Sequence, residues 1–371
     1  MLAFHMAASF LSVYLYQIGY SVTFIALFWM AFYLFKAIAS LPLASLVARI
    51  GPKHGILVSN ILFIPSMIAF ALVPLWGPWL LVAVAVFQGG SSALYSIAYG
   101  IDFSKIKSFE HAGKELAYMN VVEKITTALS PLIGGLLAFW LGPQVVLVVA
   151  AVLFLLAAVP LLHSREPIRP HQRLQLGGFP WRLVRGVVAA QIALGFDVFT
   201  SGTVWWLFTS ISIIGIQTNN EVYAANGLLM SVILIAAIAA SYAFGKLIDR
   251  HRGGDLLKIS VLFNSVTHFM RPFIGTPVAI AGLNIANETA TTGYTLAYTK
   301  GNFDNADLSG RRVAYIGILE LLSNLGASVA AGVLALLVML TNDVRGMEYL
   351  FLVTAAVVLL IVTARFPLYK K

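Results

Sequence analysis

The sequence predicts an all-α membrane protein, a bundle of about twelve spanning helices arranged as two six-helix halves. Composition, the spacing of breaks in hydrophobicity and the positions of basic residues lead to this prediction. Of the 371 residues, 60% are hydrophobic and only 11% are charged. An average soluble domain has about 25% charged residues. A chain this apolar cannot cover itself with polar surface, so most of its surface must face lipid.

Glycine, proline and charged clusters divide the chain into apolar segments, most of which can cross a hydrocarbon core of ~30 Å. The first segment, 1–16, is too short to do so, and we expect it to be the second part of a truncated helix. The expected helices are 1–16, 22–48, 54–75, 79–103, 115–140, 143–163, 184–212, 222–247, 255–272, 276–300, 312–340 and 346–366.

The turns between these segments alternate in charge. Gln17–Ser21, Pro74–Pro78 and Gly142–Pro143 contain no Lys or Arg, whereas the turns between them are basic. The basic turns and the tail hold Arg49 and Lys53; Lys105, Lys107 and Lys114; Arg165, Arg169, Arg173, Arg182 and Arg185; Lys246, Arg250, Arg252 and Lys258; Lys300, Arg311 and Arg312; and Arg365, Lys370 and Lys371. Arg271 and Arg345 are expected at the opposite membrane face.

This bias places the basic turns and the C-terminus in the cytoplasm, as in a multi-pass protein of the bacterial inner membrane. It also accounts for the formal net charge of +9 without a nucleic-acid partner. The chain contains no Cys, so thiolate metal sites and disulfides are excluded.

A polar stretch, Ser164–Pro180, follows the sixth expected helix. We expect an N-terminal half over 1–163, a cytoplasmic linker over 164–183 and a C-terminal half over 184–371. The two halves share polar and aromatic residues at a nearly constant offset. The matched pairs are Gln88 and Asn287, Ser92 and Thr291, Tyr95 and Tyr294, Tyr99 and Tyr298, and Glu123 and Glu320. Such a parallel duplication places a ligand site between the halves.

Three short motifs add to this pattern. The turn after the second helix reads Ala44-Ser-Leu-Val-Ala-Arg49-Ile-Gly51-Pro-Lys53, and the turn after the eighth reads Gly245-Lys-Leu-Ile-Asp249-Arg250. The fifth helix contains Ser130-Pro131-Leu-Ile-Gly134-Gly135. With these motifs, the spans and the duplication, the chain resembles the major facilitator superfamily, although Ala48 and Ala85 replace an acid and an Arg of that family's pattern.

The resemblance implies two halves that rock around a central site, with gating roles for Arg49, Gly51, Gly245, Asp249 and Arg250. It also implies that the first, fourth, seventh and tenth helices line the cavity. Polar stripes on these helices are therefore the expected substrate site. The candidate residues are Gln88, Ser92, Tyr95, Tyr99, Trp205, Asn284, Asn287, Thr291, Tyr294 and Tyr298. The alternative is that these residues only form hydrogen bonds between helices.

Asp197 and Glu288 fall near the middle of their helices. A carboxyl group there is either protonated or paired with a cation, and Lys36 and Lys124 are the available cations. Glu288 is the first candidate for proton coupling and Asp197 the second, with permanent ion pairs as the alternative.

Glu123 and Glu320 are expected to form a cytoplasmic gate, or simply to pair with Lys124 and the Arg311/Arg312 cluster. His5 and His268 stand isolated in the sequence, and no functional role is expected for them.

We expect a monomeric secondary active transporter of a small molecule, coupled to protons or another ion, with the antiporter-like Pro131–Gly135 element favouring export. No cofactor, metal or enzymatic activity is expected, because the phosphate-binding loop, His-Glu-x-x-His and Gly-x-Ser-x-Gly are absent from the sequence. Two alternatives remain open. One is a receptor or sensor of the same fold that no longer transports, and the other is a membrane-embedded lipid-modifying enzyme.

Overall fold

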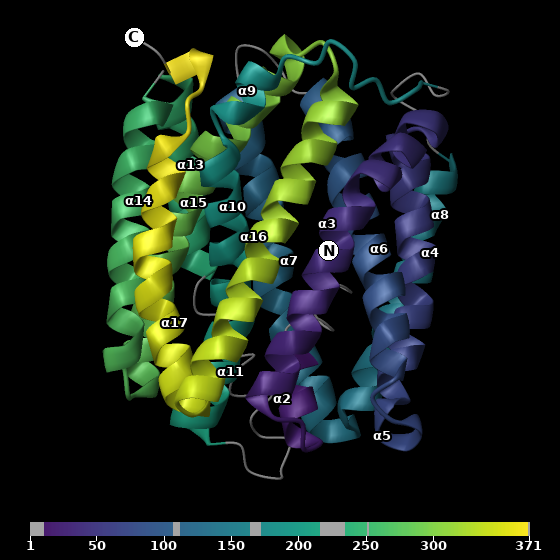
Figure 1. Cartoon of the computed structure of the whole chain (residues 1–371), viewed down its shortest axis with the longest axis vertical. Coiled ribbons are helices and arrows are strands. Elements are labelled where there is room, and N and C mark those ends of the chain that lie inside the picture. The colour runs from purple at the N-terminus through teal and green to yellow at the C-terminus, as the bar shows by residue number, and fades with distance from the viewer. Residues whose placement is uncertain (1–10, 107–111, 164–171, 216–233, 251, 370–371) are drawn as a thin grey trace.

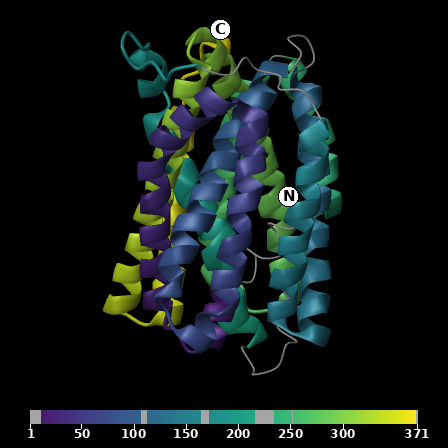
Figure 2. The same ribbon diagram turned by 90° about the vertical axis from the view of Figure 1, so that its right-hand side faces the viewer.

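The computed structural model describes residues 11–106, 112–163, 172–215, 234–250 and 252–369. Within these ranges every regular element is helical. The helices lie side by side along the long axis of the molecule, as two perpendicular views show (Figure 1, Figure 2).

The N-terminal group of helices, coloured purple to blue-teal in Figure 1, comprises α2 to α8. Its members are α2 (Leu11–Gln17), α3 (Val22–Ile50), α4 (Pro52–Ala71), α5 (Val73–Trp76), α6 (Leu80–Ile106), α7 (Ala112–Leu141) and α8 (Pro143–His163). Ser21 caps α3, because its hydroxyl accepts a hydrogen bond from the Phe24 amide at 3.2 Å. Between α3 and α4 the chain turns at Gly51, whose φ of 88° favours glycine, and Pro52 then begins α4.

The C-terminal group begins at α9 and contains two π-helical turns. Its members are α9 (Trp181–Arg185), α10 (Val188–Phe199), a π-helical turn (Thr200–Val204), α11 (Trp205–Thr209), a second π-helical turn (Ser210–Ile214), α13 (Leu234–Asp249), α14 (Gly253–Met270), α15 (Pro277–Leu308), α16 (Arg312–Leu340) and α17 (Asp343–Val357). Short 3₁₀ turns follow at Arg271–Phe273, Val358–Thr363 and Pro367–Tyr369.

The helix bounds agree closely with those expected from the sequence. The sixth and eleventh expected helices, 143–163 and 312–340, coincide with α8 and α16. The tenth is longer than expected, because α15 continues to Leu308 rather than ending near residue 300. The start of the first helix and much of the eighth lie outside the described residues.

Six helices in the described part are long and apolar enough to cross a membrane. They are Val22–Ile50, Pro52–Ala71, Leu80–Ser104, Val188–Ile213, Arg312–Leu340 and Asp343–Thr363. Large apolar side chains such as Ile38, Val82, Trp140 and Val148 lie exposed on the outer surface. In a bilayer, lipid would cover that surface.

One end of the bundle, called the basic end below, carries α9 and the C-terminus (Figure 1). Arg311 donates a hydrogen bond to the carbonyl of Gly177 there, and the Arg365 amide donates one to the carbonyl of Gly186 at 2.9 Å. The opposite end carries α5 and the turn between α16 and α17 (Figure 1).

The two helix groups are in contact at the basic end. A Cβ atom on Gly317 of α16 would come within 2.7 Å of the Cβ of Ala44 in α3, so the helices meet where a side chain does not fit. The rings of Phe103 in α6 and Phe303 in α15 pack with centroids 5.7 Å apart. These contacts join the two groups near the basic end.

Candidate functional site

A cavity of about 510 Å³ lies between the two helix groups. It is framed by α3, α4, α6, α7 and α8 on one side and by α10, the first π-helical turn and α16 on the other. Its lining residues are Trp29, Phe32, Tyr33, Lys36, Ser59, Asn60, Phe63, Gln88, Ser91, Ser92, Tyr95, Ser96, Glu123, Phe154, Gly195, Val198, Gly202, Thr203, Glu320, Ser323, Asn324 and Ala327. The mixture of aromatic rings with a few polar groups is typical of a small-molecule site.

An ion pair spans this cavity from α3 to α16. The Nζ atom of Lys36 lies 3.9 Å from Oε1 of Glu320, and it also lies 5.3 Å from the centre of the Tyr33 ring. Asn324 donates a hydrogen bond of 2.8 Å to the same Glu320 oxygen. Lys36 and Glu320 are therefore both engaged, one in each helix group.

A second ion pair joins α7 to α15. Lys124 Nζ lies 2.7 Å from Glu288 Oε1, and Thr292 donates to that oxygen at 3.2 Å. A hydrogen bond also joins α7 to the C-terminal group, because Asn120 of α7 donates to the Ser241 hydroxyl of α13 at 2.8 Å. The contact between α7 and the C-terminal group thus includes an ion pair and a hydrogen bond.

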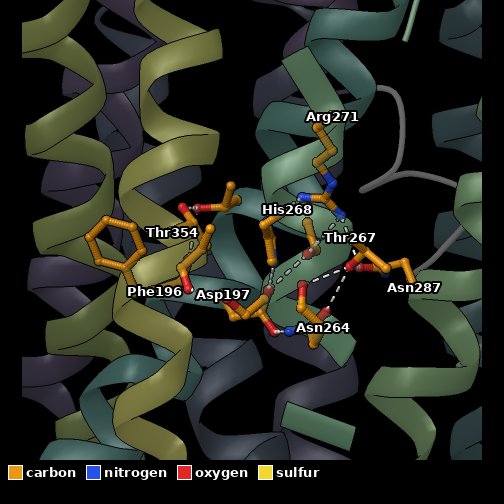
Figure 3. Close-up of polar contacts among 12 residues, drawn as sticks. Phe196, Asp197, Asn264, Thr267, His268, Arg271, Asn287 and Thr354 are labelled. Atoms are coloured by element: carbon orange, nitrogen blue, oxygen red, sulfur yellow. Dashed lines mark hydrogen bonds and ion pairs between the residues drawn. The ribbon is translucent and has the colours of Figure 1, made fainter. Parts of the chain in front are cut away.

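Asp197 lies on the α10 side of a buried polar network within the C-terminal group (Figure 3). Its Oδ1 accepts hydrogen bonds from Ser201 at 2.9 Å and from His268 Nε2 at 2.7 Å. Its Oδ2 accepts from Asn264 at 2.9 Å and from the hydroxyl of Tyr294. An ionised carboxylate has about four acceptor sites, so this one is saturated.

Arg271 completes the network from the end of α14. It donates to His268 Nδ1 at 3.0 Å, and through Nη2 to Ser201 and Asn287 at 3.1 Å each. Its guanidinium lies 5.0 Å from the centre of the Trp205 ring. A guanidinium can only donate, so His268 Nδ1 accepts, and Nε2 carries the hydrogen that goes to Asp197. This assignment leaves His268 neutral between a carboxylate and a cation.

The first π-helical turn, Thr200–Val204, connects this network with the cavity. Ser201 belongs to the network, while Gly202 and Thr203 line the cavity. An inserted π turn changes the direction in which successive side chains point, and such turns occur frequently at functional sites. Beside it, α10 and α16 pack backbone to backbone, because a Cβ on Gly195 would overlap the carbonyl of Ser323.

The fourth-helix candidates lie at the cavity. Gln88, Ser92 and Tyr95 line it, and the Tyr99 ring stacks on Tyr95 with centroids 5.5 Å apart. Glu123 and Glu320, expected at a cytoplasmic gate, also line this cavity. Trp205, the substrate-site candidate on the seventh helix, donates a hydrogen bond of 2.8 Å to Asn284 of the tenth, and both side chains are buried.

The described lining of this cavity includes no residue of α15. Asn287 and Tyr294 contact Arg271 and Asp197, as described above, and Thr291 donates to the main-chain oxygen of Glu288 at 3.1 Å. Tyr298 lines a separate cavity of about 170 Å³ between α10, α15 and α16. The polar residues of the tenth helix therefore contact neighbouring helices in this structure and do not line the central cavity.

The gating candidates of the two turn motifs lie at the basic end. Arg49 and Gly51 lie at the junction of α3 and α4, and Asp249 ends α13 with Arg250 directly after it. Gly245 lines a cavity of about 380 Å³ between α13 and the start of α7, together with Lys114. The motif after the eighth helix therefore lies beside the fifth helix.

One expectation about charged residues was wrong, and one buried cation was not expected. Arg271, expected at the opposite membrane face, directly follows α14, and its side chain is only 1% exposed. His268 was expected to be isolated, yet it is bonded to Asp197 and Arg271. A signal was present, because Asn264, His268 and Arg271 are spaced i, i+4 and i+7 and so share one helix face.

The cation assigned to Asp197 also differs from the expectation. Lys124 does pair with Glu288, but Lys36 pairs with Glu320. The charge of Asp197 is balanced by Arg271 through His268 instead. Arg271, expected at the membrane face, was not among the expected intramembrane cations, which were Lys36 and Lys124.

Membrane-crossing helices in two groups, with a polar cavity and ion pairs between them, define a membrane transporter. The chain belongs to the Major Facilitator Superfamily, whose family model matches residues 1–301. A curated relative, the multi-drug resistance efflux pump PmrA homolog of Lactococcus lactis subsp. lactis, is 23% identical over 290 residues, which cover 75% of this chain and 70% of the relative.

Solved structures of transporters share the fold. The E. coli fucose:proton symporter FucP is 14% identical, with a TM-score of 0.68 over 97% of this chain and 95% of that one. A bacterial homologue of the iron transporter ferroportin, in an outward-facing state, is 16% identical, with a TM-score of 0.67 over 98% and 96%. The human organic anion transporter MFSD10 is 14% identical, with a TM-score of 0.67 over 96% and 95%.

These findings confirm the predicted family and the all-α membrane fold. The chain is a multi-pass integral membrane protein, and its family and structural neighbours are those of a transporter rather than of an enzyme.

Proposed function

We propose that the protein is a monomeric, proton-coupled secondary transporter that exports a small solute by alternating access. Its two halves, 1–163 and 184–371, rock around the central cavity and are joined by the linker 164–183. The observation that carries the proposal is the ion pair between Lys124 of α7 and Glu288 of α15, which ties the two helix groups together at 2.7 Å.

Protonation of Glu288 would release this tie. In a medium of low dielectric the separated charges are costly, so the pair holds α7 against α15 as long as Glu288 is ionised. A proton on Glu288 removes its charge, and Lys124 keeps its own. The carboxylate on α7 that is then nearest to Lys124 is that of Glu123, which lines the cavity. A proton on Glu288 thereby changes the charge balance at the solute site.

Asp197 is the second candidate for the coupling carboxylate. Its four acceptor sites are occupied by Ser201, Asn264, His268 and Tyr294. A proton that binds Asp197 must displace one of these hydrogen-bond donors. A proton that binds Glu288 instead breaks the ion pair with Lys124, which joins the two moving halves. The geometry therefore favours Glu288 as the coupling group and Asp197 as an anchor of the C-terminal group.

Two observations support export. At the basic end, which the charge bias assigns to the cytoplasm, Ala44 packs against Gly317 and Phe103 against Phe303. Proton entry from the opposite side in this state would drive a bound solute outward on exchange. The curated relative is named as an efflux pump homolog, which supports the same direction.

The test uses inside-out membrane vesicles in which respiration builds an acid interior, reported by quenching of the dye ACMA. Neutral, anionic and cationic aromatic solutes are added in turn. A transported solute should reverse the quench in wild type, because each solute moved in releases a proton. Glu288→Gln should abolish this reversal, while Glu348→Gln of α17, outside the cavity, should retain it. Reversal at the wild-type rate in Glu288→Gln would show that Glu288 is structural.

A further inference from the structure

The central cavity has a surplus of negative charge. Among its described lining residues, Lys36 is the only cation, and Glu123 and Glu320 are the carboxylates. Lys36 and Glu320 form their own ion pair, and Asn324 adds a hydrogen bond to Glu320. After this pairing the carboxylate of Glu123 is left over.

No cation within the described residues forms an ion pair with Glu123; its neighbour Lys124 acts on it only at longer range. Its carboxylate forms neither an ion pair nor a hydrogen bond within the described residues, and its neighbour Lys124 is committed to Glu288 at 2.7 Å. Facing a cavity enclosed by apolar helices, a lone carboxylate is stabilised by a positive group brought in from outside.

A second group in the same cavity requires a hydrogen-bond donor. Gln88 is only 2% exposed, and its side-chain oxygen has no partner within the described residues. A buried acceptor without a partner costs free energy, and that cost disappears when a ligand supplies an N–H or O–H group. Both unsatisfied groups, Glu123 and Gln88, therefore accept hydrogen bonds.

Aromatic rings form part of the remaining walls, beside serines and other small residues. Trp29, Phe32, Tyr33, Tyr95 and Phe154 all line the cavity. Aromatic faces attract cations and bury apolar bodies at the same time. The volume of about 510 Å³ fits a ligand with a ring system and a short amine-bearing chain.

We propose that the solute is an amphipathic protonated amine, with its ammonium group paired with Glu123, an N–H donor facing Gln88 and its apolar body against the aromatic walls. This proposal rests on the central cavity being the transport site of the proposed function. A neutral solute leaves Glu123 without a counter-charge, and an anionic solute adds repulsion to it.

Binding is measured by isothermal titration calorimetry on the purified protein at neutral pH, with no gradient present. The probes share one ring system: 1-naphthylmethylamine, 1-naphthalenemethanol and 1-naphthoate. The amine should bind roughly 10-fold or more tightly than the alcohol, as a charge-assisted hydrogen bond implies. Naphthoate should not bind detectably.

Two variants assign the contacts. Glu123→Gln should weaken amine binding by roughly 10- to 100-fold and leave the alcohol within about twofold. Gln88→Leu should weaken the amine without changing its preference over naphthoate, and Glu348→Gln should bind all three probes as wild type does. Equal binding of amine and alcohol by wild type, or undiminished amine binding by a folded Glu123→Gln, would overturn the proposal.

The vesicle experiment separates this inference from the proposed function. If the amine binds through Glu123 but never reverses the acid gradient, the substrate class stands and proton-coupled export fails. If naphthoate reverses the gradient in a manner that depends on Glu288, proton coupling stands and the amine class fails.

Discussion

Lys124 and Glu288 join the fifth and tenth helices, the Nζ of one lying 2.7 Å from Oε1 of the other. Lys36 and Glu320 repeat this arrangement between the second and eleventh helices at 3.9 Å. In both pairs the cation belongs to the N-terminal group and the carboxylate to the C-terminal group. The pairs therefore hold together the parts that must move apart if the cavity is to open alternately to each side.

The Lys124–Glu288 pair predicts a compensating double variant. Lys124→Met leaves Glu288 buried without its cation and should lower the free energy of unfolding by roughly 3–5 kcal/mol. Adding Glu288→Gln removes the uncompensated charge and should recover most of that loss. Thermal unfolding in detergent measures both changes. If the losses of the single variants simply add in the double variant, the two residues do not interact in the protein.

The neutral bridge at His268 predicts that glutamine can replace it. Gln has one amide donor for Asp197 and one carbonyl acceptor for Arg271, so His268→Gln should fold and transport with the wild-type pH profile. His268→Leu removes both bonds and leaves buried polar groups unpaired, which should cost about 1–3 kcal/mol for each group. A folded His268→Gln that loses proton-driven transport would instead show that the imidazole itself carries the proton.

Much of this architecture is predictable from the sequence because the bilayer imposes strong rules. Apolar length and the charge of the turns indicate the spans, and ionisable residues such as Asp197 and Glu288 stand out in apolar segments. Arg271 was missed as a buried cation because it lies at the very end of the expected helix 255–272 and was therefore assigned to the membrane face. Only the tertiary structure shows that the helix end is buried.

The partners of the tenth-helix stripe could not be predicted for a related reason. Periodicity shows that Asn287 and Tyr294 share a helix face with Glu288, but it does not show what that face meets. In the structure the face is divided between Arg271, Asp197 and Lys124. The matching stripe on the fourth helix does reach the cavity, through Gln88 and Tyr95.

Closure of the basic end depends on the small size of residue 317. A Cβ at Gly317 would lie 2.7 Å from that of Ala44, so Gly317→Val should force α3 and α16 apart and open this end. The chain contains no Cys, so a reporter can be placed at Ala48, which lines a cavity at this end. Thiol labelling of Ala48→Cys in inside-out vesicles should increase several-fold in the Gly317→Val background.

Gly282→Val is the matched control, because a Cβ there has no atom within 4 Å. It should leave the labelling of Ala48→Cys unchanged. Equal labelling in the Gly317→Val and control backgrounds would mean that the contact between Ala44 and Gly317 does not govern access at the basic end.

The charge bias makes a prediction about orientation that tests the assignment of the basic end. Gln172 lies at this end, where its amide donates to the Ala48 carbonyl at 2.9 Å, and its side chain is exposed. Gly275 precedes α15 at the opposite end, and a Cβ there meets no atom within 4 Å. In whole cells an impermeant maleimide should label Gly275→Cys directly, and should label Gln172→Cys only after the membrane is permeabilised. Basic residues are retained on the cytoplasmic side during insertion, which is the physical reason for this expectation. Direct labelling of Gln172→Cys in intact cells would show that the orientation is the opposite one, with the basic end facing outward.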